Sequence, residues 1–191
     1  MTGLRALVSG FRGSVRAPRR AQVAIACALL LGLPGVVRAQ AASRSAVLTA
    51  ARDVMQRARY ATLITIGADG QPEARIVDPL VPDAQMTIWI GTNPVTRKVA
   101  DVRRDPRVTL MYFDATGNEY VSVVGHARVV TGSAERSRHW KPEWGPFYRN
   151  GASGADFLLL RVTPTRLEIV SPRHKLINDS LTWRPVTVTI P

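Results

Sequence analysis

Apolar residues between positions 43 and 60 recur every three or four residues, which is the spacing of one face of an α-helix. Ser43 or Ser45 can accept a hydrogen bond at the start of this segment and so cap it. The sequence therefore predicts an amphipathic helix over residues 43–60. The residues of its apolar face are Val47, Ala50, Ala51, Val54, Met55 and Ala58.

Downstream of this helix the chain changes to short runs of β-branched and other apolar residues separated by turn signals, a pattern typical of strands. Asp69-Gly70 predicts a tight hairpin between the first two runs. Segment 94–104 has Pro94 in its first turn and predicts a short helix, and another follows Ser133 and ends near Trp140. The predicted strands cover residues 61–66, 73–79, 86–91, 107–114, 120–131, 156–162, 166–170 and 186–190.

Short strands joined by hairpin turns, with helices at the edges and no repeated βαβ alternation, indicate a mainly β protein. We expect an antiparallel barrel or sandwich with flanking helices. A barrel of about six strands leaves little interior space for a ligand. A second copy of the chain would complete such a site, so we expect a homodimer.

The first 41 residues have the pattern of an export signal. Residues 1–20 contain five arginines and no acidic residue, and residues 21–37 are apolar apart from Gln22. This apolar run is short for a membrane span and is broken by glycine and proline, which favours cleavage over a stable membrane anchor. The small-x-small motifs Val37-Arg-Ala39 and Ala39-Gln-Ala41 predict cleavage near residues 39–41, and the mature protein would be periplasmic or secreted. Arg19-Arg20 resembles a twin-arginine signal, and a general secretory signal is the alternative.

Cleavage would leave residues 42–170 as the folded domain and residues 171–191 as a C-terminal extension. It would also remove Cys27, the only cysteine, so no disulfide is expected; acylation of Cys27 as in a lipoprotein is the alternative. The first 41 residues hold six arginines, so the formal net charge of +12 falls to +6. Because no basic helical stripe accompanies this charge, we expect no nucleic-acid partner.

The strongest chemical signal is a group of cations and hydroxyls near the second and third predicted strands. Arg75 lies on the second strand, and the turn after the third carries Thr92, Thr96, Arg97 and Lys98. Phosphate dianions are held by Arg and Lys, by hydroxyls and by backbone N–H groups at a helix start. Each cation alone fits a solvated surface, but together they predict a phosphate site.

Four segments resemble the pyridoxamine 5'-phosphate oxidase-like flavoproteins, and in particular their small general-stress-protein type. They are Glu73-Ala-Arg-Ile-Val77, Trp89-Ile-Gly-Thr-Asn-Pro-Val-Thr-Arg-Lys98, Asp105-Pro-Arg-Val-Thr-Leu-Met-Tyr112 and Tyr120-Val-Ser-Val-Val-Gly-His-Ala127. The resemblance implies an FMN-binding split β-barrel of antiparallel, Greek-key type, with FMN at the interface of a homodimer.

The resemblance also implies roles for single residues. Arg75, Arg97 and Lys98 would hold the FMN phosphate, and Thr92 would hydrogen-bond the ribityl-phosphate region. Ile76 and Val77 would line the isoalloxazine ring, and Tyr120 would lie near the flavin.

The chain differs from pyridoxamine 5'-phosphate oxidase itself at positions where that enzyme binds its substrate. Lys175-Leu-Ile177 stands in place of an Arg-Leu-His pattern, and Val170 replaces a common aromatic residue. These changes argue against pyridoxamine phosphate as the substrate. We expect a flavin-dependent oxidoreductase that transfers hydride to or from an unidentified small molecule.

Two alternatives remain open. One is a reductase that uses the deazaflavin F420, and the other is a non-catalytic dimer that binds flavin or haem. The three histidines have no metal-ligand spacing, so no metal is expected. The aromatic residues Trp140, Trp144, Phe147 and Tyr148 either pack in the core and dimer or line a pocket over the flavin.

Overall fold

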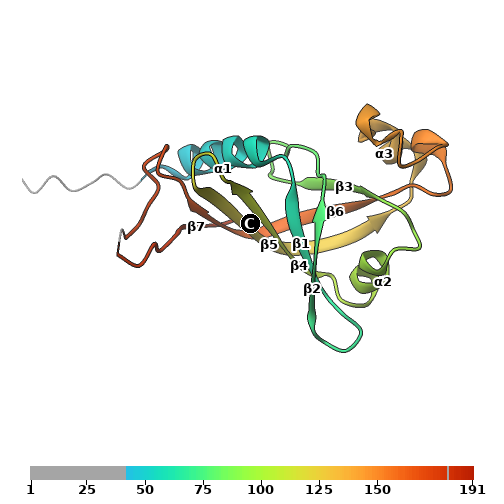
Figure 1. Cartoon of the computed structure of the whole chain (residues 1–191), viewed down its shortest axis with the longest axis horizontal. Coiled ribbons are helices and arrows are strands. Elements are labelled where there is room, and N and C mark those ends of the chain that lie inside the picture. The colour runs from blue at the N-terminus through green and yellow to red at the C-terminus, as the bar shows by residue number, and fades with distance from the viewer. Residues whose placement is uncertain (1–41, 180) are drawn as a thin grey trace, which may run out of the picture. The chain divides into compact units, whose positions relative to one another are not determined.

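The computed structural model describes residues 42–179 and 181–191, so the predicted signal peptide lies outside the described residues (Figure 1). The predicted elements are present, with ends that differ from the prediction by up to three residues, apart from one pair of strands. The helices are α1 (Arg44–Ala58), α2 (Arg97–Arg104) and α3 (Ser133–Arg138), with 3-10 turns η1 (Pro142–Trp144) and η2 (Gly151–Ser153). The strands are β1 (Ala61–Ile66), β2 (Pro72–Val77), β3 (Ile88–Thr92), β4 (Arg107–Asp114), β5 (Glu119–Val130), β6 (Leu158–Val170) and β7 (Val186–Thr189).

All strand pairs are antiparallel, in the order β2-β1-β4-β5-β6-β3, and β7 pairs with the remaining length of β6. One isolated bridge between Pro79 and Ile90 joins the chain beyond β2 to β3, the two ends of this order. The sheet of seven strands is otherwise open. The fold-class prediction, a mainly β antiparallel protein of the split-barrel type with flanking helices, is confirmed.

The prediction of two separate strands over 156–162 and 166–170 is wrong, because these residues form the single strand β6. Thr163-Pro164 suggested a break, but Pro164 lies between the part of β6 paired with β3 and the part paired with β7. The register with β5 shifts there, which leaves Thr165 unpaired as a bulge. Opposite this bulge, a Cβ on Gly125 would clash with the carbonyl oxygen of Thr163. A proline is therefore tolerated where the regular ladder is already interrupted.

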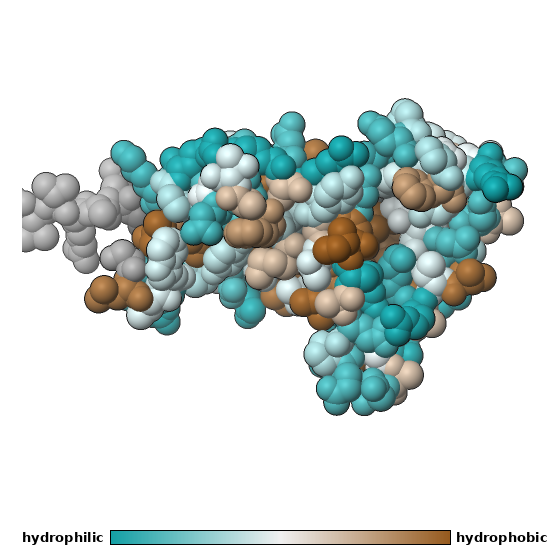
Figure 2. Space-filling model, viewed as in Figure 1, coloured by the Kyte–Doolittle hydropathy of each residue, from teal (hydrophilic) through white to brown (hydrophobic). Residues whose placement is uncertain are grey.

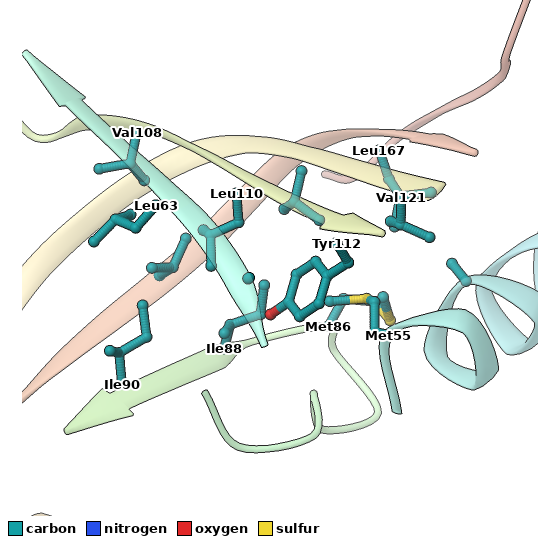
Figure 3. Close-up of a cluster of buried hydrophobic side chains, with 14 of the residues drawn as sticks. Met55, Leu63, Met86, Ile88, Ile90, Val108, Leu110, Tyr112, Val121 and Leu167 are labelled. Carbon is teal, nitrogen blue, oxygen red and sulfur yellow. The ribbon is translucent and has the colours of Figure 1, made fainter. Parts of the chain in front are cut away.

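The main core lies between the inner face of the sheet and α1. In β1 and β4 every second side chain is buried, as expected for strands with one face toward a core. α1 buries one stripe of small and medium apolar residues, and its predicted cap is confirmed because Ser43 Oγ accepts a hydrogen bond from the Ala46 N–H at 3.2 Å. Figure 3 shows side chains from α1 and from strands across the sheet pointing toward one another. These include Met55, Leu63, Ile88, Ile90, Leu110, Tyr112, Val121 and Leu167.

A second, aromatic cluster lies outside this core. It is formed by Trp89 on β3 and by the segment between α3 and β6. Trp140, Trp144, Tyr148 and Phe157 meet mainly in edge-on arrangements, with ring centroids 4.9–6.3 Å apart. The second cluster therefore fixes the segment that follows α3 against β3.

Ionic contacts join α1 to the end of the sheet and to the C-terminal segment. Glu119 is fully buried and accepts hydrogen bonds from Arg57 at 2.5 Å and from Ser171 Oγ at 2.7 Å. Arg57 also pairs with Asp53 and Asp114. Burial alone lowers the pKa of Arg57, but its bonds to the three carboxylates outweigh burial and raise that pKa. These contacts thus supply the positive charge and hydrogen bonds that the Glu119 carboxylate needs to remain ionised while buried.

None of the helices in the described part of the chain is long and apolar enough to cross a membrane.

Candidate functional site

A groove of about 270 Å³ opens where β2, the end of β3, the first turn of α2 and the segment after α3 come together. Three of the predicted site residues, Ile76, Val77 and Lys98, line it. The complete lining is Arg59, Tyr60, Ile76, Val77, Asp78, Gly91, Lys98, Glu143, Trp144, Phe147 and Tyr148. The groove therefore combines apolar and aromatic side chains with a cation supplied by a helix start.

Lys98 is the partly buried cation of this groove. Burial, followed by the nearby charge of Arg75, lowers the pKa of Lys98 from its ordinary 10.5. Among the described residues no carboxylate lies within 4.0 Å of the Lys98 ammonium. A partly desolvated cation without a counter-ion is a favourable place for an anionic ligand.

The start of α2 offers further donors beside Lys98. Thr96 occupies the N-cap position but makes no side-chain cap, and the first turn contains no acidic residue. Instead the Thr96 hydroxyl donates to the carbonyl oxygen of Asn93 at 2.9 Å. The first N–H groups of the helix therefore have no capping side chain, which is the usual condition for anion binding at a helix N-terminus.

Arg75 and Arg97 lie close to this point but already have carboxylate partners. The Arg75 guanidinium donates to Glu73 at 2.8 Å, to Asp101 at 3.4 Å and to the Thr65 hydroxyl. Arg97, which is largely exposed, pairs with the same Glu73 oxygen at 3.3 Å. The structure thus brings the three predicted phosphate-binding cations into one neighbourhood, with two of them sharing a carboxylate.

Asp101 is the second carboxylate of this neighbourhood. Burial alone raises the pKa of Asp101, but hydrogen bonds from Thr65 and Arg104 and the charge of Arg75 outweigh it and hold that pKa below 3.8. Two carboxylates, Glu73 and Asp101, thus lie among four basic side chains, which leaves an excess of positive charge; the basic residues are Arg75, Arg97, Lys98 and Arg104.

The other two predicted site residues lie further from the groove lining. Thr92 is buried at the end of β3, and its hydroxyl lies 3.1 Å from that of Thr96, so it shapes the turn before α2. Tyr120 lies on β5, three strands from β2, between Phe113 and Val170 in the strand register. It does not line the groove within one chain.

The carboxylates around the candidate site were not predicted from the sequence. Glu73 lies two residues before Arg75 on the same strand, and alternate strand residues share a face, so this pairing could have been found. Asp101 lies three residues before Arg104 on α2 and pairs with it at 3.1 Å, so this helical spacing was a second signal. Asp78 carried no such signal, yet it accepts hydrogen bonds from Lys141 at 2.7 Å and from Trp144 Nε1 at 3.2 Å.

Within residues 42–179 and 181–191 no group of three His, Cys, Asp or Glu side chains could hold a metal ion.

Solved structures share this fold. A protein from Clostridium acetobutylicum related to general stress protein 26 of Bacillus subtilis matches with a TM-score of 0.64 and 18% identity, over 75% of this chain and 94% of that one. A general stress protein 26 from Jannaschia sp. CCS1 matches with a TM-score of 0.60 and 20% identity, over 76% and 99%. A general stress family protein from Xanthomonas campestris matches with a TM-score of 0.59 and 21% identity, over 68% and 90%. At these identities the likeness shows the fold.

A comparison with curated proteins found no match. The family model for pyridoxamine 5'-phosphate oxidase matches residues 47–171, a span that includes every strand from β1 to β6 and both sides of the groove. Since this span is well over half of the chain, the protein belongs to the pyridoxamine 5'-phosphate oxidase family.

Proposed function

We propose that this protein binds FMN in the groove between β2, α2 and the segment after α3, and acts as a flavin-dependent oxidoreductase on a small molecule. The observation that carries the proposal is Lys98, a partly buried cation without a carboxylate partner among the described residues, at the uncapped start of α2. Apolar side chains of Ile76 and Val77 lie in the same groove.

The residues present fit the two ends of this cofactor. The phosphate needs cations and N–H donors, which Lys98, Arg97 and the first turn of α2 supply. Arg75, held by Glu73 and Asp101, adds positive charge close to Lys98. The ring needs an apolar surface, which Ile76 and Val77 supply. When bound, FMN supplies the hydride-accepting and hydride-donating chemistry, and the protein positions it and excludes water.

A second copy of the chain would complete the site. The groove of about 270 Å³ is slightly smaller than the roughly 300–1,000 Å³ of most cofactor pockets. The outer face of β2 and β4 also exposes large apolar side chains, with Ile76 68% and Phe113 55% exposed and Met111 exposed between them. Figure 2 shows hydrophobic residues near the middle of the surface in view, with hydrophilic residues around them. Such a patch is typical of an interface.

Flavin titration tests the cofactor and separates it from F420. FMN, riboflavin and F420 are titrated in turn into the purified protein while ligand fluorescence is followed. We expect FMN to bind most tightly, and Lys98→Met to weaken FMN about 10- to 150-fold, the value of one charge-assisted hydrogen bond. Riboflavin, which lacks the phosphate, should bind the two proteins equally. Tighter binding of F420, or no flavin binding at all, would refute the proposal.

The catalytic and dimeric parts of the proposal need their own measurements. Bound flavin should be reduced by a nicotinamide donor and reoxidised by an acceptor, whereas a redox-silent flavin would indicate a non-catalytic binding protein. Light scattering should report a dimer, and Phe113→Glu should convert it to a monomer, because a charge cannot be buried unpaired in an apolar interface. N-terminal sequencing of the protein from the periplasm or medium would test the proposed export.

A further inference from the structure

We propose that Asp78 is a positioning residue that holds residues 141–148, here called the aromatic wall, against β2, and that this wall binds the planar ring of the ligand. The inference rests on the proposed function and deepens it. It assigns recognition of the ring to a part of the groove separate from the phosphate-binding residues.

Asp78 joins the aromatic wall to the strand that carries two groove residues. It follows Val77 directly, and its carboxylate oxygens accept one hydrogen bond each from Lys141 Nζ at 2.7 Å and Trp144 Nε1 at 3.2 Å. Lys141 also lies 5.8 Å from the centre of the Trp144 ring. A single carboxylate thus bonds two residues more than sixty positions away, and both bonds end on the wall.

Trp144 is held from the other side by β3. A Cβ on Gly91 would lie only 2.8 Å from the Trp144 ring, so the absence of a side chain at Gly91 lets the ring lie directly on the strand. Phe157 packs on the same ring with centroids 5.8 Å apart. Trp144 is therefore fixed between Asp78, Gly91 and Phe157 and is almost completely buried.

The fixed Trp144 sets the position of the residues that follow it. The Phe147 and Tyr148 N–H groups both donate to the Trp144 carbonyl oxygen, at 2.9 and 3.1 Å, so one turn links the three residues. Phe147 lines the groove although 76% of it is exposed, as does Ile76 with 68% exposed. Two large apolar side chains of one groove, both outside the core, form a surface suited to a flat apolar ring.

The cationic end of the groove does not serve this purpose. Lys98 belongs to α2, whereas Phe147 and Tyr148 belong to the wall, so charge recognition and ring recognition come from different elements. The wall therefore selects a planar aromatic ring, whatever phosphate-bearing chain is attached to it.

The test compares riboflavin and FMN as probes in Phe147→Ala, Asp78→Ala and the milder Asp78→Asn. Phe147→Ala should weaken both ligands by the same factor, about 2- to 12-fold, the range of one aromatic contact. Asp78→Ala should weaken both at least as much. In Asp78→Ala, FMN that still binds through Lys98 should also lose less of its fluorescence on binding than in the unmodified protein. The aromatic wall would no longer hold its side-chain rings against the flavin. Trp183→Ala, which removes an exposed aromatic side chain of the C-terminal segment, is the matched control and should change neither affinity.

The outcomes separate this inference from the proposed function. If FMN binds and depends on Lys98 but Phe147→Ala changes neither affinity nor quenching, the wall has no such role, while the FMN site stands. A loss confined to FMN would likewise place Phe147 or Asp78 with the phosphate-binding residues and overturn the inference. If Asp78→Ala does not fold, Phe147→Ala still decides, since its side chain is mostly exposed and outside the core.

Discussion

The buried carboxylate of Glu119 makes the stability of the domain depend on one arginine. Arg57 donates to Glu119 at 2.5 Å and to Asp114 at 2.8 Å, and Glu119 has no exposed surface. Arg57→Met keeps much of the apolar stem but removes the guanidinium. Glu119 would then remain buried as an anion with much of its compensation gone.

The magnitude follows from the contacts that remain. Removing one partner of a buried ion pair costs about 3–5 kcal/mol. Arg57 is itself partly exposed, and Glu119 keeps the Ser171 hydroxyl at 2.7 Å and the Arg173 N–H at 3.1 Å, so the lower end applies. We expect the free energy of unfolding to fall by about 3 kcal/mol near neutral pH, which lowers the Tm by about 6–12 °C.

The pH dependence adds a second check. Burial alone raises the pKa of Glu119, but hydrogen bonds from Ser171, Arg57 and Arg173 outweigh it and lower that pKa below 4.5. Stability from a carboxylate with a lowered pKa is present above the unfolded-state value and is lost as the pH falls through the folded-state value. Arg57→Met weakens this effect, so the unfolding free energies of the two proteins should differ most near neutral pH and converge as the pH falls below 4.5 and Glu119 becomes protonated.

Urea unfolding across this pH range measures both effects. The double variant Arg57→Met/Glu119→Gln should recover part of the loss, because a neutral amide is easier to bury than an unpaired anion. A loss below about 1 kcal/mol near neutral pH, or a difference that does not shrink in acid, would contradict the reasoning.

Two further predictions concern the bulge and the groove. Gly125→Ala should lower the free energy of unfolding by about 1–3 kcal/mol, because its Cβ would meet the β6 backbone; Gly132→Ala, with open space around it, is the control, and equal losses would show that the close approach does not matter. Affinity for FMN should fall as the pH rises toward 10.5, since burial and Arg75 lower the pKa of Lys98. The affinity for riboflavin should not fall in this way. If the affinity of Lys98→Met for FMN fell equally as the pH rose, Lys98 would be excluded as the cause.

Much of the fold could be predicted because local patterns agree with the long-range pairing. The helical spacing of α1 and the Asp69-Gly70 hairpin both depend on residues close in sequence. The exception is β6, where Pro164 suggested a break. Its tolerance depends on a bulge opposite Gly125 and on a change of partner from β3 to β7. Both features arise from pairing between strands that are distant in the sequence, so a short stretch of sequence around Pro164 does not reveal them.

The candidate site residues that the sequence suggested lie together only in part. Lys98, Ile76 and Val77 line one groove, since the cation and the strand residues come from adjoining elements. The ionic partners of Arg75 were not predicted. The two bonds of Asp78 were not predicted either, because they join the end of β2 to residues 63 and 66 positions away in the sequence. Sequence spacing therefore located the cations better than the groups that position them.

The pairing of β3 with β6 also has a consequence for the order of folding during synthesis. β3 ends at Thr92, but its only strand partner in the described sheet begins at Leu158, so it has no ladder to join until that later segment has left the ribosome. The same pairing brings Gly91 beneath Trp144. Contacts this distant in sequence slow folding because the long intervening loop must first close. The groove is thus completed late, and a nascent chain that stops short of β6 has no assembled place for a ligand.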